Sequence, residues 1–206
     1  MKLSKTNYLI FRECGKNAWV KIHKPEIYNS SPLSAFEGGI IETGNEVDEL
    51  ARDLFPGGVL IEKRDDFEYT KELIKNKNPI LYQPVFETDK YQIACDIFVY
   101  NEQTKKYDVC EVKASNSGED KKKKDKLYSY DLAFQYIILK KLKIPIGNLY
   151  IVRLNQKYSF DSELEIEKLF TKENFSEEVF EIEKVVEEEI KIAYDFLSET
   201  KEPNGY

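Results

Sequence analysis

Hydrophobic residues recur along the chain with two different spacings, and each spacing predicts a different secondary structure. Where they return every three or four positions, one face of an α-helix is apolar. Pro25 ends the first such segment, and Pro56 with the glycines after it stops the second, which opens at Thr43. The segments with helical spacing are residues 3–24, 43–55, 69–76, 126–142 and 176–198.

Shorter runs rich in β-branched and aromatic residues predict strands. They cover residues 59–61, 80–86, 91–100, 107–114 and 149–154. Pro84 favours an edge position or a bulge for the second run, because proline has no N–H for the ladder. A polar connection between the third and fourth runs predicts an antiparallel hairpin. This order of elements predicts an α/β (α+β) fold in which a mixed sheet is covered by helices.

The length and composition are those of one globular domain with an appended helical element. The chain has 206 residues, 41% of them hydrophobic, with 14 Tyr and 12 Phe, which suffices for an ordinary core. The net charge of -7 argues against a histone-like attraction to nucleic acid, but it leaves room for a local basic groove. Since no run could span a bilayer and no signal-peptide pattern is present, we expect a soluble, cytoplasmic protein without membrane contact.

Two acids interrupt the strands of the predicted hairpin. We expect Tyr100 to face Tyr107 across the turn. Antiparallel pairing then places Asp96 opposite Glu111, and because side chains alternate along a strand, Lys113 shares their face. Like charges directly opposite each other are unfavourable, and a divalent cation would offset their repulsion. A solvent-facing stripe with an ordinary surface ion pair is the alternative interpretation.

The two acids and the lysine are a set suited to phosphoryl chemistry. Carboxylate oxygens suit Mg²⁺ or Mn²⁺ better than zinc, with water and substrate phosphate as the remaining ligands. A cation held by Asp96 and Glu111 would polarise a phosphoryl group and favour attack by water. Lys113 would orient that water or neutralise charge in the transition state. The hairpin therefore contains the residue types that hydrolysis of a phosphodiester bond requires.

A hairpin acid, an acid-x-lysine triplet and a glutamine on the next helix follow one another as Asp96, Glu111-Val112-Lys113 and Gln135. This order resembles the PD-(D/E)XK nuclease superfamily, and more closely its RecB-like branch, which includes CRISPR-associated exonucleases. The resemblance, which extends to about residue 158, implies a restriction-endonuclease-like three-layer fold with a mixed central sheet flanked by helices. It implies that Asp96, Glu111 and the backbone carbonyl of Val112 bind the metal. Lys113 becomes the catalytic lysine, and Gln135 supports the site or touches the nucleic acid.

The N-terminal region resembles the same family in its residue types. Leu3-Ser4-Lys5-Thr6, Cys14 and Trp19 fit a Leu-Ser-x-(Ser/Thr) segment, a cysteine and an aromatic-rich helix. CRISPR-associated relatives often hold an iron–sulfur cluster through this cysteine and three C-terminal ones. No cysteine follows Cys110 here, so we expect no cluster and interpret Cys14 as a packing residue. His23 lies outside every matched motif and is expected to be structural.

Two family motifs are matched only in part. The GxxxH motif corresponds to Gly44 through Asp48, with Asp48 in place of the histidine. Asp48 is therefore a candidate metal ligand, and the adjacent Glu49 is a competing one. The QxxxY motif begins at Gln135 but has Leu139 where tyrosine is usual.

Several residues are candidates for contact with nucleic acid, since phosphates attract basic side chains and bases stack on aromatic rings. They are Lys5, Arg12, Lys121, Lys122, Lys123, Lys124 and Tyr128. A solvated loop is the alternative for the lysine run. The acidic helix over 176–198 would repel phosphates, so we expect it to pack on the back of the domain or to contact another protein.

These observations predict a RecB-like nuclease domain over residues 1–160 and an acidic helical extension over 161–206 that packs on the same domain. The expected activity is Mg²⁺- or Mn²⁺-dependent hydrolysis of phosphodiester bonds in DNA, as an exonuclease or directed to single strands or ends. The alternative is a catalytically weak or inactive nuclease-like module that binds nucleic acid or protein, which the absent histidine and tyrosine would explain.

Overall fold

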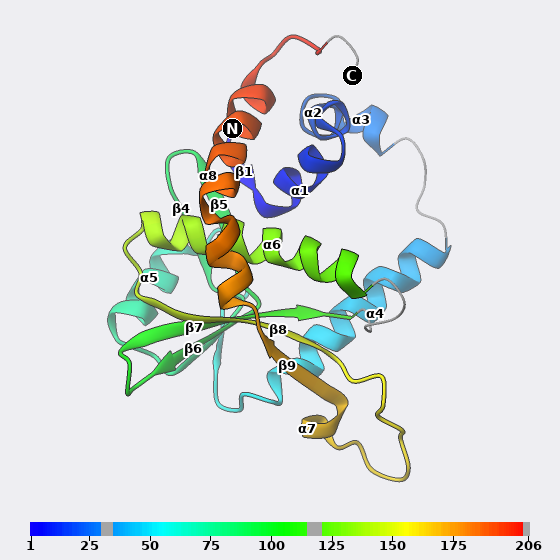
Figure 1. The fold of residues 1–206 in the computed structure, drawn as a ribbon, viewed down its shortest axis with the longest axis vertical. Coiled ribbons are helices and arrows are strands. Elements are labelled where there is room, and N and C mark those ends of the chain that lie inside the picture. The colour runs from blue at the N-terminus through cyan, green and yellow to red at the C-terminus, as the bar shows by residue number, and fades with distance from the viewer. Residues whose placement is uncertain (30–34, 115–120, 204–206) are drawn as a thin grey trace.

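A six-stranded mixed sheet forms the centre of the protein, and helices cover both of its faces (Figure 1). The computed structural model describes residues 1–29, 35–114 and 121–203, without the side chains of residues 35–42. The strands in spatial order are β2 (Val59–Leu60), β3 (Ile80–Tyr82), β6 (Ile97–Asn101), β7 (Lys106–Lys113), β8 (Ile146–Leu154) and β9 (Phe170–Asn174). The pairs β2–β3 and β7–β8 are parallel, and the others are antiparallel. The predicted mixed sheet is confirmed.

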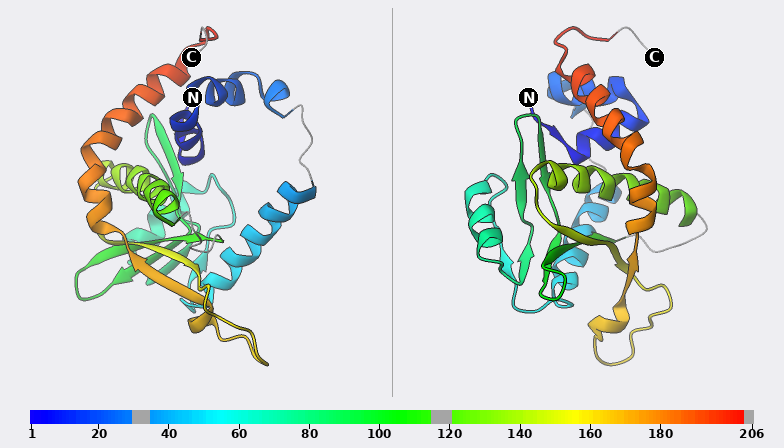
Figure 2. Two further views of the ribbon diagram at one scale, coloured as in Figure 1. Left: turned by 45° about the vertical axis from the view of Figure 1, so that its right-hand side comes forward. Right: turned by 60° about the vertical axis from the view of Figure 1, so that its left-hand side comes forward.

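Each face of this sheet packs against a different set of helices (Figure 2). One core contains Phe98 and Val109 of the sheet together with Phe134 of α6 and Val186 of α8. On the opposite face, Cys110 and its neighbours pack against α4 and α7. The helices are α1 (Lys5–Glu13), α2 (Gly15–His23), α3 (Pro25–Tyr28), α4 (Ala35–Arg52), α5 (Phe67–Lys75), α6 (Lys121–Lys141), α7 (Ile166–Leu169) and α8 (Ser176–Ser198).

Two of the predicted strands are each divided, and the two divisions lie against each other. The run 80–86 breaks at Gln83 and Pro84, where Gln83 has a φ of 52° and Pro84 has no N–H to donate. The run 91–100 breaks at Cys95 and Asp96. Gln83 N–H donates to the carbonyl of Asp96 (2.8 Å), and Cys95 N–H donates to the carbonyl of Pro84 (3.0 Å).

Because of these breaks, a second, smaller sheet stands beside the first. It contains β4 (Val85–Glu87), β5 (Tyr91–Ala94) and β1 (Leu3–Ser4). The hairpin of the main sheet is formed by β6 and β7, with Tyr100 paired to Tyr107 and Phe98 to Val109. The predicted register is thus confirmed, while Asp96 lies just before β6 rather than inside a continuous strand.

The predicted helices are present, with some changes at their ends. The segment 3–24 is a short strand followed by α1 and α2, because Cys14 has an extended backbone (φ -157°, ψ 107°) that separates the two helices. The second helix begins at Ala35 instead of Thr43, and α6 begins at Lys121, so the lysine run lies on its first turn. The predicted loop over residues 30–34 lies outside the described residues.

The C-terminal segment contributes a strand as well as a helix. The segment predicted as a helical extension, residues 161–206, contains the α8 helix and also β9, which pairs with β8 at the edge of the main sheet. The α8 helix buries an apolar stripe against α6, α1 and α2, and Lys141 of α6 pairs with Glu187 of α8 (2.6 Å). Among the described helices, none has the length and apolar character needed to cross a membrane.

Candidate active site

The β6–β7 hairpin brings the predicted acids and lysine together. Glu111 and Lys113 are alternate residues of β7 and lie on the face that α6 covers. Asp96 directly precedes β6, and its Oδ2 accepts the backbone N–H of Val112 (2.8 Å). This hydrogen bond fixes the Asp96 carboxylate against β7, next to Glu111.

Glu111 is the centre of a buried hydrogen-bonded network. Its Oε1 accepts from the Nζ atoms of both Lys113 (2.6 Å) and Lys5 (2.7 Å). Its Oε2 accepts from Nε2 of Gln135 (2.8 Å), a residue of α6 with no exposed surface. Since a carboxylate has about four lone-pair positions, one position on Oε2 is left. The sequence predicts Lys5 as a contact to nucleic acid, whereas the structure places its ammonium group inside this network.

Asp131 is a fifth member of the network that the sequence reasoning missed. It is 3% exposed and contacts Nζ of Lys113 (2.6 Å), Nζ of Lys5 (3.2 Å) and Nε2 of Gln135 (2.9 Å). Both hydrogen-bond partners of the Gln135 amide nitrogen are carboxylates, which determines the orientation of this amide. The signal in the sequence was the spacing, because Asp131 lies one helical turn before Gln135 on the same face.

The charges of the network shift the pKa values of its members. Burial raises the pKa of Asp96 to about 8, and the nearby Glu111 carboxylate adds to the rise. Burial acts in the same direction on Glu111, but Lys113 and Lys5 outweigh it and hold the pKa of that carboxyl well below its usual range. For Lys113, burial lowers the pKa, and Asp131 and Glu111 more than compensate, so its pKa is raised. Glu111 is therefore ionised and Lys113 protonated at neutral pH.

A second group of polar residues approaches Asp96 from α4. Oδ2 of Asp48 accepts from Arg52 Nη2 (2.9 Å) and Gln83 Nε2 (2.9 Å). The charge of Asp48 also contributes to the raised pKa of Asp96. Glu49, the competing candidate ligand, is exposed to solvent. Of the two acids, Asp48 is thus the one that lies toward the hairpin.

The donor set of the site fits a hard divalent cation in part. Asp96 and Glu111 supply carboxylate oxygens, and hard cations bind through one or two carboxylates plus water and substrate oxygens. Two buried side-chain oxygens, Asp48 Oδ1 and Gln135 Oε1, have no hydrogen-bond partner among the described residues. Within the same part of the chain, no three acidic, histidine or cysteine side chains are grouped closely enough to hold a metal ion by themselves. The fit therefore rests on two carboxylates, with backbone or water oxygens completing the shell.

The predicted nucleic-acid contacts are divided between free and engaged side chains. Lys122 and Lys123 are exposed on the first turn of α6, whereas Lys121 pairs with Glu173 of β9 (3.2 Å). Arg12 donates to Glu189 of α8 (2.8 Å) and stacks on a tyrosine ring. Tyr128 is 7% exposed and lies 5.4 Å from the Lys113 ammonium. These contacts argue against roles for Arg12 and Tyr128 in binding nucleic acid.

The cysteines and the histidine have different surroundings. Cys14 is exposed at the junction of α1 and α2, so its interpretation as a packing residue is wrong. Cys95 and Cys110 are buried. His23 is structural, as expected: its Nε2 contacts the carbonyl of Leu197 (2.8 Å), and its ring stacks on Trp19 with centroids 4.5 Å apart.

Comparisons with known proteins bear on the fold. No family model matches the chain, and no match was found among the curated proteins. Among solved structures, the chain is similar to a phage-related exonuclease from Haemophilus somnus 129PT, with a TM-score of 0.53 and 14% sequence identity. The similarity covers 96% of this chain and 93% of that chain. At this identity the likeness shows a shared fold, and it confirms the predicted fold class.

Proposed function

We propose that the protein is a metal-dependent deoxyribonuclease of the RecB-like branch of the PD-(D/E)XK superfamily. The observation that carries the proposal is the buried network in which Lys113 and Gln135 hold Glu111 beside Asp96. A fold shared along nearly the whole chain with a protein described as a phage-related exonuclease supports it. The substrate is DNA, as single strands or ends.

Two residues of the network have roles that follow from their charge states. Lys113 is protonated and held by two carboxylates, so it acts as a fixed cation that orients water or neutralises transition-state charge, and it does not act as a base. Gln135 fixes the Glu111 carboxylate through Oε2. Both roles depend on geometry that is present before substrate binds.

Asp96 and Glu111 are the proposed ligands of Mg²⁺ or Mn²⁺, with the carbonyl of Val112 and Asp48 as further candidates. A cation at this position would polarise the scissile phosphoryl group and assist ionisation of the attacking water. Asp48 has one oxygen engaged by Arg52 and Gln83, and one that has no partner in the part of the chain that the structure describes. Its free oxygen is the one available to the cation or to a water bound to it. An iron–sulfur cluster is not part of this proposal.

The test is cleavage of end-labelled single- and double-stranded DNA with Mg²⁺ or Mn²⁺. We expect Glu111→Gln and Lys113→Met to lower the cleavage rate by at least about 10²–10³-fold, the usual effect of removing one transition-state contact. Glu102→Gln and Lys105→Met are matched controls, because this exposed pair lies in the turn of the same hairpin (2.7 Å). Equal activity of Glu111→Gln and Glu102→Gln would contradict the proposal.

Two observations favour a second candidate function, a nuclease-like module that binds nucleic acid or protein with little or no cleavage. Two lysines share Oε1 of Glu111, which reduces the negative charge available to a cation. Exposed apolar residues of α8, such as Phe180 and Ile192, also provide contact area for a protein partner. Binding of DNA without cleavage in either metal would select this candidate.

A further inference from the structure

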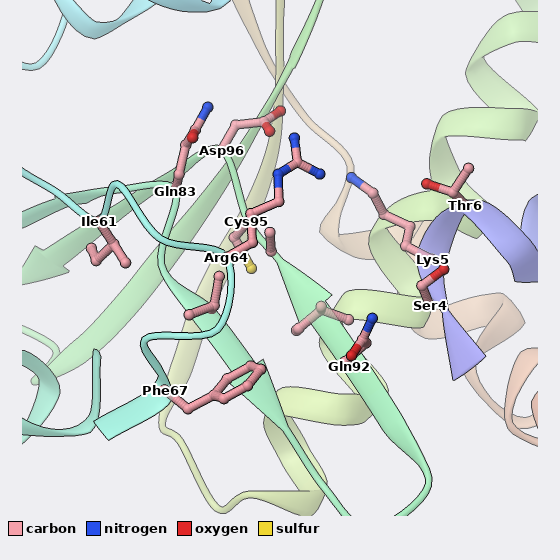
Figure 3. A pocket seen from close by; sticks show the side chains of 13 residues that line it. Ser4, Lys5, Thr6, Ile61, Arg64, Phe67, Gln83, Gln92, Cys95 and Asp96 are labelled. Atoms are coloured by element: carbon pink, nitrogen blue, oxygen red, sulfur yellow. The ribbon is translucent and has the colours of Figure 1, made fainter. Parts of the chain in front are cut away.

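A cavity of about 250 Å³ opens next to Asp96 and borders the network of Glu111 at Lys5 (Figure 3). Its walls come from the start of α1, from the segment between β2 and α5, and from the facing breaks of the two sheets. The polar residues that matter here are Lys5, Thr6, Arg64, Gln83, Gln92 and Asp96. Apolar side chains, Ile61 and Phe67 among them, form the rest of the lining.

Arg64 is the cation in this lining that is free to bind a ligand. Its guanidinium extends toward the space between Asp96 and Lys5 in Figure 3. Across residues 1–29, 35–114 and 121–203, no hydrogen bond or ion pair involves its side chain, which is exposed. Lys5, the other cation of the cavity, is engaged by Glu111 and Asp131. An arginine side chain is always charged, and its planar group matches the oxygens of a phosphate.

The position of Arg64 next to the hairpin indicates which anion it would bind, a backbone phosphate of the substrate. Asp96 lines the cavity and is also a proposed metal ligand, so an anion at Arg64 lies next to the reacting phosphate. A nucleic acid strand carries a second phosphate at each neighbouring nucleotide. The apolar lining, Ile61 and Phe67, offers contact to the sugar between them. A cavity of about 250 Å³ is too small to enclose a duplex, so the strand whose phosphate enters it is unpaired there.

We propose that this cavity is a substrate subsite in which Arg64 binds the backbone phosphate adjacent to the scissile one on a single strand. The inference rests on the proposed nuclease function and adds a specificity-determining residue to it. Gln92 borders the same space with an amide group that can donate to a phosphate oxygen. Gln83 also borders it, but its amide nitrogen donates to Asp48 (2.9 Å).

Binding is measured without cleavage, by fluorescence anisotropy of a short oligothymidylate in EDTA. We expect Arg64→Gln to weaken binding about tenfold, as for the loss of a charge-assisted hydrogen bond, and to reduce the salt slope of the binding constant by about one. Lys63→Gln is the matched control, since this exposed neighbour has the same charge and does not line the cavity. We expect its affinity to stay within about twofold of wild type, a change of less than 1 kcal/mol.

A scan with one neutral methylphosphonate linkage per strand locates the contact. For the wild type, a methylphosphonate at one position of the strand should remove most of the binding affinity. For Arg64→Gln, a methylphosphonate at that position should cause no further loss, because the phosphate charge that it removes no longer has Arg64 as a partner. Equal affinities of Arg64→Gln and Lys63→Gln, or the same scan profile in wild type and Arg64→Gln, would overturn the subsite. Unchanged unfolding midpoints for both variants establish that the comparison is between folded proteins.

The outcome is separable from that of the nuclease proposal. Binding that depends on Arg64, without cleavage in Mg²⁺ or Mn²⁺, would retain the subsite and reject the nuclease. Cleavage that depends on Glu111, with no effect of Arg64 on binding, would retain the nuclease and reject the subsite.

Discussion

Two buried ionic networks lie side by side between the main sheet and α6, and they differ in how completely their groups are paired. One surrounds Glu111 and Lys113 on β7, and the other surrounds Arg153 on β8. Lys113 and Arg153 are register partners in the parallel pair of strands. Both networks also contain an aspartate of α6, Asp131 in the first and Asp125 in the second. The same helix and the same sheet face therefore support two different arrangements.

The Arg153 network is saturated. Arg153 is 1% exposed, donates from Nε to Glu173 (2.8 Å) and from Nη1 to Asp125 (2.7 Å), and makes a further contact to Glu173 through Nη2. No buried side-chain atom of these three residues lacks a partner within the described part of the chain. The network connects the start of α6 with β9, which is a structural function.

The Glu111 network is unevenly paired. Two ammonium groups share one oxygen of Glu111, while Oε1 of Gln135 is buried without a partner among the described residues. Beside them, burial and Glu111 raise the pKa of Asp96 to about 8. Buried polar groups are nearly always satisfied in native proteins, so unpaired ones need a reason. We infer that the uneven network is arranged for a ligand, and the even one for stability.

The largest expected effect concerns the saturated network. Arg153→Met should lower the free energy of unfolding by about 3 kcal/mol, because it leaves two acids without their buried partner. Lys168→Met is the control, since it removes an exposed pair with Glu165 (2.6 Å) and should cost less than about 0.5 kcal/mol. Urea denaturation measures both. A loss of similar size in the two variants would mean that the Arg153 network is not a structural one.

The next effect concerns the positioning of Lys113. Asp131→Asn should reduce the cleavage rate about 10–100-fold, as is typical when a partner that orients an active-site group is lost. Asp195→Asn, an exposed acid of α8, should leave the rate unchanged. Because Asp131 does not border the Arg64 cavity, Asp131→Asn should bind the oligonucleotide in EDTA with the same affinity as the wild type. A folded Asp131→Asn protein with the wild-type rate would show that Lys113 needs no second anchor.

Removing one of the two lysines that contact Glu111 tests whether the uneven pairing of this network limits metal binding. Lys5→Met should tighten Mn²⁺ binding by about tenfold, or about 1.4 kcal/mol, because the cation no longer competes with that ammonium for Oε1. Titration calorimetry gives this affinity without any measurement of activity. The control is Lys16→Met, whose side chain pairs with Glu202 (3.4 Å) away from the site. An unchanged or weaker affinity in Lys5→Met would contradict the competition.

The smallest effect is a dependence of stability on pH. Hydrogen bonds from Arg153 and Lys121 lower the pKa of Glu173, so the unfolded chain binds more protons than the folded protein as the pH falls. Glu173 therefore stabilises the fold above the ordinary pKa of glutamate, and this contribution is lost at lower pH. Because Glu173 is partly exposed, we expect its contribution to the free energy of unfolding to be less than about 1 kcal/mol.

Urea midpoints at pH 7 and pH 4 test this dependence. The urea midpoint of Glu173→Gln should fall less from pH 7 to pH 4 than that of the wild type. The midpoint of Glu163→Gln, which replaces an exposed acid, should fall as much as that of the wild type. Parallel losses in all three proteins would assign the acid sensitivity to other carboxylates.

The sequence predicted the part of the site that depends on local pairing. The polar turn fixed the pairing of Tyr100 with Tyr107, and strand alternation then placed Glu111 and Lys113 on one face near Asp96. The resemblance added Gln135, whose Nε2 donates to Oε2 of Glu111 (2.8 Å). Asp131 was within reach of the same reasoning, because helical periodicity places it on the face of Gln135.

Other members of the site depend on contacts between distant parts of the chain. Lys5 reaches Glu111 across 106 positions of sequence, and Gln83 meets Asp48 only because two strand breaks lie against each other. Cys14 fitted a family motif and was interpreted as a packing residue, yet the turn between α1 and α2 leaves it exposed. No local pattern contains this information.

By itself, the sequence determined the order of elements, the hairpin and its acids, since these follow from spacing and alternation over a few residues. The tertiary structure decided that Lys5 and Asp131 share the charge of Glu111, that Arg64 borders the cavity beside Asp96, and that the Arg153 network is closed. Pairing of charges depends on which side chains meet after the helices pack on the sheet. That packing is governed by the burial of apolar surface over the whole chain.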